Sequence, residues 1–197
     1  MTVAVIGTGF IGGTLGRAFA RAGLPTVFGS RHPGDDQAAG DTDARVTSVA
    51  DATAEADTVV LALAANAVED FLAAHSSALA GKLIVDAANN LAAPVANSAE
   101  AVARLVPEAR YARAFNTLGG ENFADPIFDG VPADLFYSAS PEDRDMLEAL
   151  INAVGLRPMY LGEGQQDTVD GVLRLWFALA ITQKNGRNLA FRTLIRP

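Results

Sequence analysis

The feature that most constrains this chain is the glycine-rich turn GTGFIGG, which begins at residue 7. It follows the apolar run Val3–Ile6, a pattern typical of a strand buried on both faces of a parallel sheet. It opens a segment from Phe10 to Ala22 whose apolar residues recur at helical spacing, and Gly23 then favours a helix end. A strand, a glycine turn and a helix in this order predict a dinucleotide-binding unit.

The glycines fit the pattern G-x-G-x-x-G, in which each has its own physical role. Gly7 allows the tight turn, Gly9 lets a pyrophosphate approach the backbone, and Gly12 lets the helix lie close to the strand. Free amides at the helix N-terminus attract the phosphates. The simpler alternative is a turn that only packs the helix on the strand, but the flanking strand and helix favour binding. We expect cofactor contacts from Gly7, Thr8, Gly9, Phe10, Ile11 and Gly12.

The end of the second predicted strand, Pro25–Phe28, indicates which dinucleotide binds. An NAD site usually carries an acidic residue here, whereas this chain reads GSRH, with no carboxylate before Asp35. A guanidinium can bind a 2′-phosphate in a bidentate manner and stack on adenine. The sequence therefore predicts NADP rather than NAD, with Ser30 and Arg31 at the 2′-phosphate. His32 is either a further contact to the phosphate or adenine, or an exposed loop residue.

Strand and helix patterns alternate along most of the chain. Further strands are predicted at Thr58–Leu63, Leu83–Val85, Tyr111–Phe115, Asp134–Ser138 and Arg157–Leu161, further helices at Ser48–Ala56, Val68–Leu79, Ser98–Leu105 and Pro141–Val154, and a loop at His32–Asp43. This alternation predicts an α/β fold with a doubly wound, mostly parallel Rossmann-type sheet and helices on both faces. Ser48, with Asp51 three residues later, is a candidate helix cap.

The last third of the chain changes character. The predicted helix Thr168–Thr182 is apolar nearly all round, so we expect it to pack on the edge of the sheet or on a second subunit. From Gln183 onward, basic residues alternate with apolar ones, which indicates either a partner-binding arm or a frayed end. We predict an NADP-binding Rossmann-type domain over residues 1–165. Residues 166–197 form a C-terminal helical segment with a basic tail, in the same compact unit.

Small and amide-bearing residues follow three further strands. In open parallel sheets, ligands bind beyond the carboxyl ends of the strands, where these residues would line a channel for the nicotinamide ribose. Each asparagine could equally serve turn formation, although their recurrence at three strand ends favours binding. The residues predicted on this basis to contact the cofactor are Ala64, Ala65, Asn66, Ala88, Asn89 and Asn116.

The sequence assigns no catalytic residue. His75 and Ser76 are adjacent on a predicted helix, so their side chains diverge. With two histidines and no cysteine, no metal site is predicted. Tyr111, Tyr137 and Tyr160 are candidate proton donors only if one of them faces the nicotinamide. Direct hydride transfer between two redox cofactors would need no acid or base from the protein, which would only position the two rings.

The charge balance constrains the partners. The chain has 15 basic and 23 acidic residues and a formal charge of −8, a surface that repels nucleic acid and anionic lipid. We therefore expect a small-molecule substrate, no nucleic-acid partner and no membrane partner. The first residues enter a strand without a basic leader, and no apolar run reaches the ~18–20 residues that span a bilayer. The expected location is the cytoplasm.

Three segments together carry a resemblance to a known family. GTGFIGGTLGRAFARAG, the GSR after the second strand, and ARAFNTLGGENFADP resemble the deazaflavin-dependent NADP reductases, that is, the NADPH:coenzyme F420 oxidoreductases and their small bacterial relatives. The same domain resembles the cytosolic part of six-transmembrane metalloreductases and, more distantly, the N-terminal domain of pyrroline-5-carboxylate reductase. The resemblance covers roughly residues 1 to 182.

The resemblance implies a function as well as a fold. It implies NADP on the Gly7 turn with Ser30 and Arg31 at its 2′-phosphate, a deazaflavin or flavin near the nicotinamide beside the AFNT segment, and a homodimer through the C-terminal helices. The leading hypothesis is an NADP-dependent oxidoreductase with a deazaflavin or flavin-type acceptor. The alternatives are an NADPH-dependent reductase of a small carbonyl or imine and a non-catalytic NADP-binding regulatory module. A carbonyl or imine reductase usually needs a proton donor at its active site. A metalloreductase-type electron shuttle would need a membrane partner.

Overall fold

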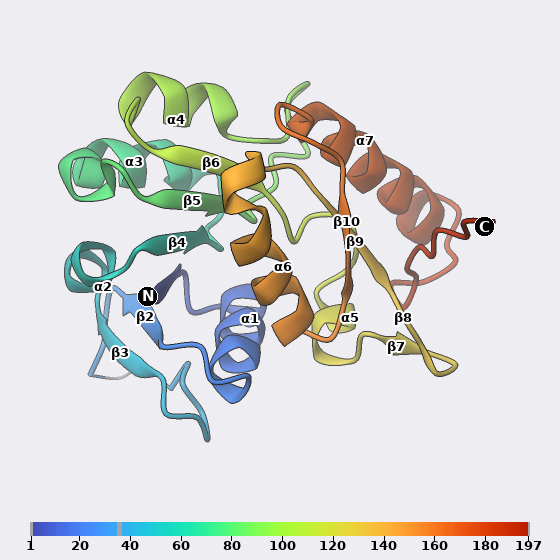
Figure 1. Ribbon diagram of the computed structural model, residues 1–197, viewed down its shortest axis with the longest axis horizontal. Coiled ribbons are helices and arrows are strands. Elements are labelled where there is room, and N and C mark those ends of the chain that lie inside the picture. Colours follow the sequence, from blue (N-terminus) through green and yellow to red (C-terminus); the bar gives the residue numbers. More distant parts are fainter. Residues whose placement is uncertain (1, 35–36, 197) are drawn as a thin grey trace.

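Six parallel strands form the central sheet of the computed structural model, which describes residues 2–34 and 37–196 (Figure 1). The strands are β1 (Val3–Ile6), β2 (Thr26–Ser30), β3 (Arg45–Ser48), β4 (Thr58–Leu61), β5 (Leu83–Asp86) and β6 (Arg110–Arg113). Their order is β3-β2-β1-β4-β5-β6, so β1 pairs in parallel with both β2 and β4. The strand order reverses there, and this opens a crevice at the carboxyl ends of β1 and β4.

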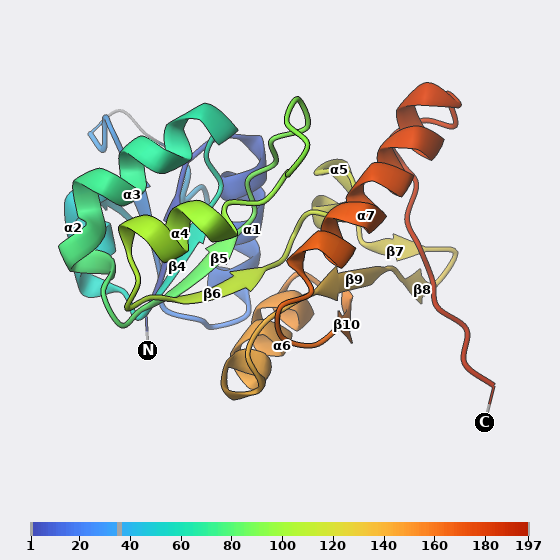
Figure 2. The ribbon, with the colours of Figure 1, turned by 90° about the horizontal axis from the view of Figure 1, so that it is seen from above.

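Helices cover both faces of this sheet, as predicted (Figures 1 and 2). On one face lie α1 (Phe10–Arg21) and α6 (Arg144–Ala153), and on the other α2 (Val49–Glu55), α3 (Ala65–Leu79) and α4 (Ala99–Leu105). Alternate residues of each strand enter opposite cores: Val3 and Val5 pack with α1 and α6, whereas Ala4 and Ile6 pack with α2, α3 and α4. The doubly wound α/β fold predicted from the sequence is confirmed.

The helix cap predicted at Ser48 is present. The Ser48 hydroxyl accepts a hydrogen bond from the Asp51 amide at 3.1 Å and donates one to the Asp51 carboxylate at 2.7 Å. This reciprocal pair fixes the start of α2 directly after β3. The short edge strand β3 itself was not predicted, because its sequence, RVTS, is only half-buried and shows no apolar run.

A smaller layer lies beside the main sheet. β9 (Asp134–Tyr137) and β10 (Arg157–Tyr160) form a separate parallel pair, joined to the main sheet by an antiparallel bridge between Arg113 and Ser138. Between β9 and α6 lies the 3₁₀ turn η1 (Pro141–Asp143). The helical turn α5 (Glu121–Ala124) and the hairpin of β7 (Ile127–Phe128) and β8 (Val131–Pro132) were not predicted, because elements of two to four residues show no period in a sequence.

The C-terminal helix α7 (Gln166–Phe177) continues into a π-helical turn, η2 (Ala178–Thr182). It contacts β6 and β9, which confirms the predicted packing on the edge of the sheet. Its burial is one-sided: Leu173 and Trp176 are buried, whereas Leu175, Phe177 and Ile181 are exposed. Within the described ranges, no helix combines the length and apolar character needed to cross a membrane.

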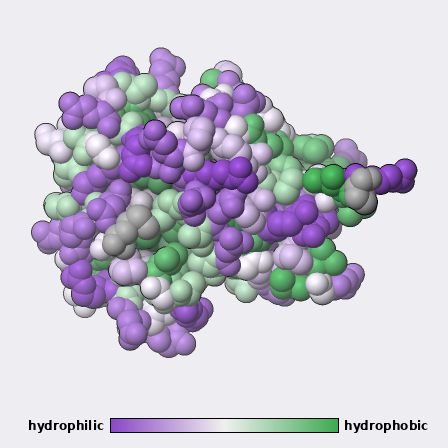
Figure 3. Space-filling view, in the orientation of Figure 1, coloured by the Kyte–Doolittle hydropathy of each residue, from purple (hydrophilic) through white to green (hydrophobic). Residues whose placement is uncertain are grey.

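The basic tail is not frayed, which corrects one of the two interpretations of its sequence. After η2 the chain reverses and runs back beside α7 (Figure 2). The Phe191 carbonyl accepts from the Asp134 amide at 2.9 Å, and the Thr193 amide donates to the Asp134 carboxylate at 2.5 Å. Beyond this anchor, Leu194 and Ile195 are exposed, and Figure 3 shows hydrophobic surface gathered at this end of the molecule.

Candidate functional site

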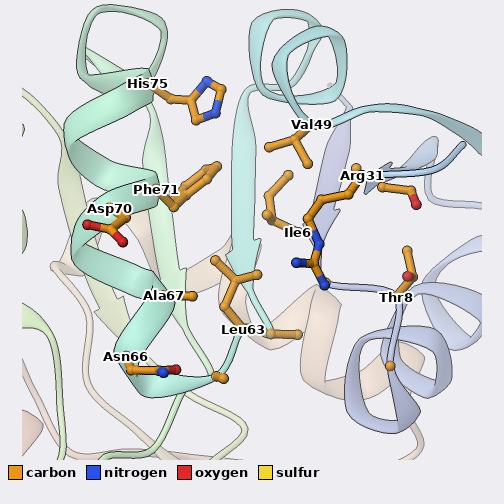
Figure 4. A pocket seen from close by; sticks show the side chains of 16 residues that line it. Ile6, Thr8, Arg31, Val49, Leu63, Asn66, Ala67, Asp70, Phe71 and His75 are labelled. Carbon is orange, nitrogen blue, oxygen red and sulfur yellow. The ribbon is translucent and has the colours of Figure 1, made fainter.

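A cavity of about 740 Å³ lies at the carboxyl ends of β1, β2 and β4 (Figure 4). It occupies the crevice where the strand order reverses, the usual ligand position in an open α/β sheet. Seven of the residues predicted to contact a cofactor line it, namely Gly7, Thr8, Gly9, Ser30, Arg31, Ala64 and Asn66. The structure thus brings together the glycine turn, the end of β2 and the start of α3.

The three glycines of the turn have different spatial surroundings. A Cβ on Gly7 would lie 2.4 Å from the Ala62 carbonyl oxygen, and the residue has φ +107°, which favours glycine. A Cβ on Gly12 would lie 1.8 Å from the Gly7 oxygen. A Cβ on Gly9 would meet nothing within 4 Å. The fold therefore needs Gly7 and Gly12, whereas Gly9 leaves space free inside the cavity.

Two helix N-termini border this cavity. Gly9 caps α1 and Ala64 caps α3; neither contributes a capping side chain, and neither fully described first turn contains an acidic residue. The first amides of both helices therefore lack a side-chain acceptor from these positions and carry the positive end of the helix dipole. In a chain of formal charge −8, the two N-termini form a local site for an anion, and one carboxylate, that of Asp70, also lines the cavity.

The end of β2 supplies a cation to the same cavity. Figure 4 shows the Arg31 side chain extending over the cavity, facing α3 across the gap. Ser30 is buried and its hydroxyl accepts from the His32 amide at 3.1 Å. His32 is exposed and lies outside the lining of the cavity. Asp35, the first carboxylate after β2 in the sequence, lies outside the described residues.

Sequence reasoning missed two aromatic rings in this cavity. Phe71 and His75 on α3 both line it, with ring centroids 4.9 Å apart (Figure 4). Their spacing of four residues places both rings on one helix face. The sequence interpretation considered His75 only together with its neighbour Ser76 and therefore missed this pair. His75 departs from helical geometry, with φ −119° and ψ 15°, so α3 is kinked at this ring.

A second, smaller cavity of about 150 Å³ is bordered by Ile11 of the glycine-rich segment GTGFIGG. Its lining includes Ile11, Asn89 and Asn116 from the predicted set, together with Trp176 and Arg187 of the C-terminal segment. The remaining predicted residues lie elsewhere: Phe10 is exposed, Gly12 is packed under the turn, and Ala65 and Ala88 line a hollow beside α4.

A buried ion cluster lies behind the second cavity. The Arg113 guanidinium is fully buried, 3.2 Å from the Asp86 carboxylate and 2.7 Å from that of Asp170. It donates to the side-chain oxygen of Asn89 at 2.9 Å, and the Asn116 amide nitrogen donates to the same oxygen at 3.0 Å. No sequence pattern predicts this cluster, because its charged members lie far apart in the chain.

The three tyrosines considered as proton donors point elsewhere. Tyr111 donates to Asp86 at 2.8 Å, Tyr137 to Glu148 at 3.0 Å, and Tyr160 to the Ala139 carbonyl at 3.0 Å. Burial, reinforced by Asp86, raises the pKa of Tyr111 well above its usual value, and burial together with Glu148 raises that of Tyr137. In the described part of the chain, neither cavity is lined by a tyrosine.

Glu121, next in the chain to the lining residue Gly120, is also a poor proton donor. Glu121 accepts from Arg187 at 2.6 Å, and this hydrogen bond lowers the pKa of Glu121. Arg187 in turn lies 5.6 Å from the ring centre of Trp176. A carboxylate that is paired in this way is ionised at neutral pH. Among the described lining residues of the second cavity, Arg187 is the one with a charged side chain, and a guanidinium does not give up its proton.

The part of the chain that forms most of the large cavity matches a known family. Residues 2–90, which contain the glycine turn, the end of β2 and the first strand ends, match the family model described as NADP oxidoreductase coenzyme F420-dependent. The N-terminal part of the chain is thus similar to this family. Its members are NADP-dependent oxidoreductases, so the chain is placed among the oxidoreductases, and the resemblance noted in the sequence is confirmed.

Solved structures extend the likeness beyond residue 90. A hypothetical protein of Sinorhizobium meliloti is 30% identical, with a TM-score of 0.70 over 83% of this chain and 85% of that one. A protein of Arthrobacter sp. FB24, proposed to be an F420-dependent NADP reductase, is 24% identical, with a TM-score of 0.83 over 99% of this chain and 100% of that one. A reductive aminase of Aspergillus terreus in complex with NADPH is 22% identical, with a TM-score of 0.71; the alignment covers 90% of this chain but 61% of the aminase.

Proposed function

We propose that this protein moves a hydride between NADP(H) and a deazaflavin or flavin-type acceptor. One observation carries the proposal. The glycine-rich segment GTGFIGG borders two cavities, a large one with two helix N-termini and the cation Arg31, and a small one that offers no proton donor among its described lining residues. The first suits a phosphorylated dinucleotide, and the second suits chemistry that needs positioning and no acid or base.

The large cavity fits the phosphates and adenosine of NADP. Gly9 leaves open space where a side chain would exclude a pyrophosphate, and the N-termini of α1 and α3, which have no capping side chain, border the same cavity. Arg31 is placed to pair with the 2′-phosphate, and buried Ser30 lies beside it. Phe71 offers an apolar ring to the adenine. The proposed cofactor contacts are Gly7, Thr8, Gly9, Ser30, Arg31, Ala64 and Asn66, with Phe71 and His75 added to the predicted set.

The small cavity fits the nicotinamide ring. Ile11 and Asn116 line it, and the apolar Leu91 and Phe177 at its wall are partly exposed. A nicotinamide seated there would lie beside these two apolar side chains, and a planar acceptor ring would stack on it there. NADPH supplies a hydride when bound; the protein residues hold the two rings in contact and exclude water.

The exposed apolar side chains of α7 and η2 are the proposed dimer interface. Leu175, Phe177 and Ile181 are 51%, 38% and 37% exposed, and Phe177 also lines the small cavity. A second copy of the chain would cover these side chains and complete the wall of the acceptor site. Light scattering that shows a dimer for the wild type and a monomer for Leu175→Glu would support this interface, and a wild-type monomer would contradict it.

An acceptor panel tests the proposed reaction. NADPH oxidation is followed at the nicotinamide absorbance band with coenzyme F420, FMN, a ketone and a cyclic imine in parallel. The proposal expects turnover with a deazaflavin or flavin and none with the ketone or imine. Turnover with the imine alone would favour the reductase of small substrates. Tight NADP binding without turnover against any acceptor would indicate a regulatory module.

A further inference from the structure

We propose that Asn116 presents its side-chain oxygen as the acceptor for the carboxamide N–H of the nicotinamide. We also propose that Arg113 is a positioning residue that fixes this orientation through Asn89. This inference rests on the proposed function, because it needs the nicotinamide in the small cavity. It adds a donor–acceptor rule: the ligand group that meets Asn116 must donate a hydrogen bond.

The orientation follows from what each side chain is able to donate. A guanidinium donates hydrogen bonds and accepts none, so the Asn89 atom 2.9 Å from the Arg113 Nη2 is the amide oxygen. The same oxygen lies 3.0 Å from the Asn116 amide, which must therefore present its NH₂ group to Asn89. The Ala88 carbonyl, another acceptor, lies 3.5 Å from the same nitrogen. The Asn116 oxygen is left on the opposite side.

Arg113 itself has little freedom to move. Its Nε donates to Asp170 at 2.9 Å, its Nη1 lies near Asp86 and the Ala88 carbonyl, and its Nη2 lies 2.7 Å from Asp170. The second oxygen of Asp170 accepts from the Ala96 amide at 3.2 Å and from Asn97 at 2.8 Å. Carboxylates on two sides thus hold the guanidinium in place. The orientation of two asparagine amides is set by a charge that does not touch the cavity.

The side-chain oxygen of Asn116, which these contacts leave over, is an unsatisfied acceptor within the part of the chain that the structure describes. Asn116 is 1% exposed and lines the small cavity, and its side-chain oxygen has no hydrogen-bond partner among residues 2–34 and 37–196. Two other buried atoms share this condition, the Thr117 hydroxyl and one oxygen of Glu121, but neither residue lines the cavity. An unpaired buried acceptor is costly, so a ligand that donates to it regains that energy on binding. The NH₂ of a nicotinamide carboxamide is such a donor.

The test compares two nucleotides that differ in this donor. The 3-acetylpyridine analogue of NADP has a methyl group in place of the carboxamide NH₂ and keeps the carbonyl and the ring. Isothermal titration calorimetry measures Kd for both oxidised forms. Wild type is expected to bind NADP roughly 5- to 20-fold more tightly than the analogue, the effect of one hydrogen bond that otherwise leaves a buried acceptor unpaired. Asn116→Leu, which keeps the volume, is expected to bring this ratio close to one.

The positioning role is tested at Asn89, because substitution of Arg113 threatens the fold. Asn89→Leu removes the oxygen that both Arg113 and Asn116 donate to, and it is expected to lower the NADP-to-analogue ratio. Asn89→Asp keeps acceptor oxygens at this position and should retain the ratio. Asn90→Leu, the same change at the next, exposed residue, is the matched control and should also retain it. A merely structural role for Asn89 would change both affinities and leave the ratio intact.

Binding of adenosine 2′,5′-bisphosphate tests the proposed NADP site independently of the role of Asn116, because this compound contains no nicotinamide. If wild type binds neither this compound nor NADP, the proposed NADP site is wrong and the inference fails with it. If wild type binds both, but shows equal affinity for NADP and the acetylpyridine analogue, only the role of Asn116 is overturned. The same conclusion follows if Asn116→Leu retains the wild-type ratio.

Discussion

The carboxylate of Asp170 lies 2.7 Å from the guanidinium of Arg113, and this contact joins the C-terminal helix to the last strand of the central sheet. Both side chains are buried, so the attraction is weakly screened by water. Removal of one member would leave an uncompensated buried charge. We therefore expect Asp170→Ala to lower the free energy of unfolding by ~3–5 kcal/mol, measured by urea denaturation.

The control for this substitution is an ion pair on the surface. Glu69 and Arg104 are 2.8 Å apart and both are mostly exposed. Glu69→Ala should cost no more than ~1 kcal/mol. Equal effects of the two substitutions would show that the Arg113 cluster contributes no more than a solvated pair.

The same contact bears on the domain organisation. We propose that residues 166–197 belong to one folding unit with residues 1–165, because Arg113 is paired from both sides of that boundary. The full chain should then unfold in a single calorimetric transition, and a chain that ends at residue 165 should lack cooperative unfolding. Two separate transitions in the full chain would reject this proposal.

Substitutions of two glycines of the turn should have different effects, one on NADP affinity and the other on the stability of the fold. Gly9→Ala places its Cβ in open space inside the large cavity, so the melting temperature should stay close to wild type while NADP affinity falls. Gly12→Ala forces a Cβ to within 1.8 Å of the Gly7 oxygen, so it should lower the melting temperature itself. Gly34→Ala, also at an open position, serves as control for both. Unchanged NADP affinity in Gly9→Ala would place the pyrophosphate elsewhere.

Arg31 should discriminate between the two nicotinamide nucleotides. Arg31→Ala removes the proposed partner of the 2′-phosphate, so we expect NADP binding to weaken by ~1.5–3 kcal/mol, the value of a charged hydrogen bond, while NAD binding hardly changes. Titration of both nucleotides by calorimetry measures the difference. Arg45→Ala, an exposed arginine paired with Glu55 and outside the cavity, is the matched control. Equal losses for NADP and NAD would exclude a phosphate-specific role.

The anchor of the tail should be sensitive to acid. Burial alone would raise the pKa of Asp134, but hydrogen bonds from Arg157 and from the Thr193 amide outweigh it, and the pKa is lowered. A carboxylate whose pKa is lower in the folded state than in the unfolded state stabilises the fold fully at pH values above the unfolded-state pKa of ~3.9. This stabilisation is lost as the pH falls through the folded-state pKa.

Asp134→Asn should therefore remove part of the dependence of stability on pH below about pH 4, measured by urea denaturation at several pH values. Asp43→Asn, at an exposed position, should leave the dependence close to that of the wild type. Hydrogen exchange at the Thr193 amide gives a local readout, because its protection should decrease in the same acidic range as the anchor is lost. Protection of Thr193 that does not vary with pH would contradict the assigned role of Asp134.

Much of the fold was predictable because it depends on local patterns. Buried strands such as Val3–Ile6 are continuous apolar runs, and helices such as α1 have apolar residues at helical spacing. The cap at Ser48 adds a local start signal for α2. Only the period of the pattern is needed to infer such elements, and their alternation then implies a parallel sheet. The pairing of β9 with β10 outside the main sheet was not predictable in this way, because a pattern of strands does not specify which strands are neighbours.

The large cavity was mostly predictable for the same reason. Gly7, Gly9 and Arg31 lie within two adjoining elements, and topology alone carries their strand ends to one edge of the sheet. Phe71 and His75 were not predicted to line the cavity, because an aromatic residue and a histidine on an apolar helix resemble core residues. Only the packing of α3 shows that the helix face that carries them borders the cavity.

The sequence by itself determined the alternation of strands and helices, the glycine turn and the arginine at the end of β2, since each depends on residues close together in the chain. The tertiary structure alone decided how Asn116 is oriented. That orientation depends on Asp170 and Arg113, 57 positions apart, meeting behind Asn89. Buried charges must be paired, but a sequence does not say with which partners. The three-dimensional packing makes that choice, and with it sets the polarity of the small cavity.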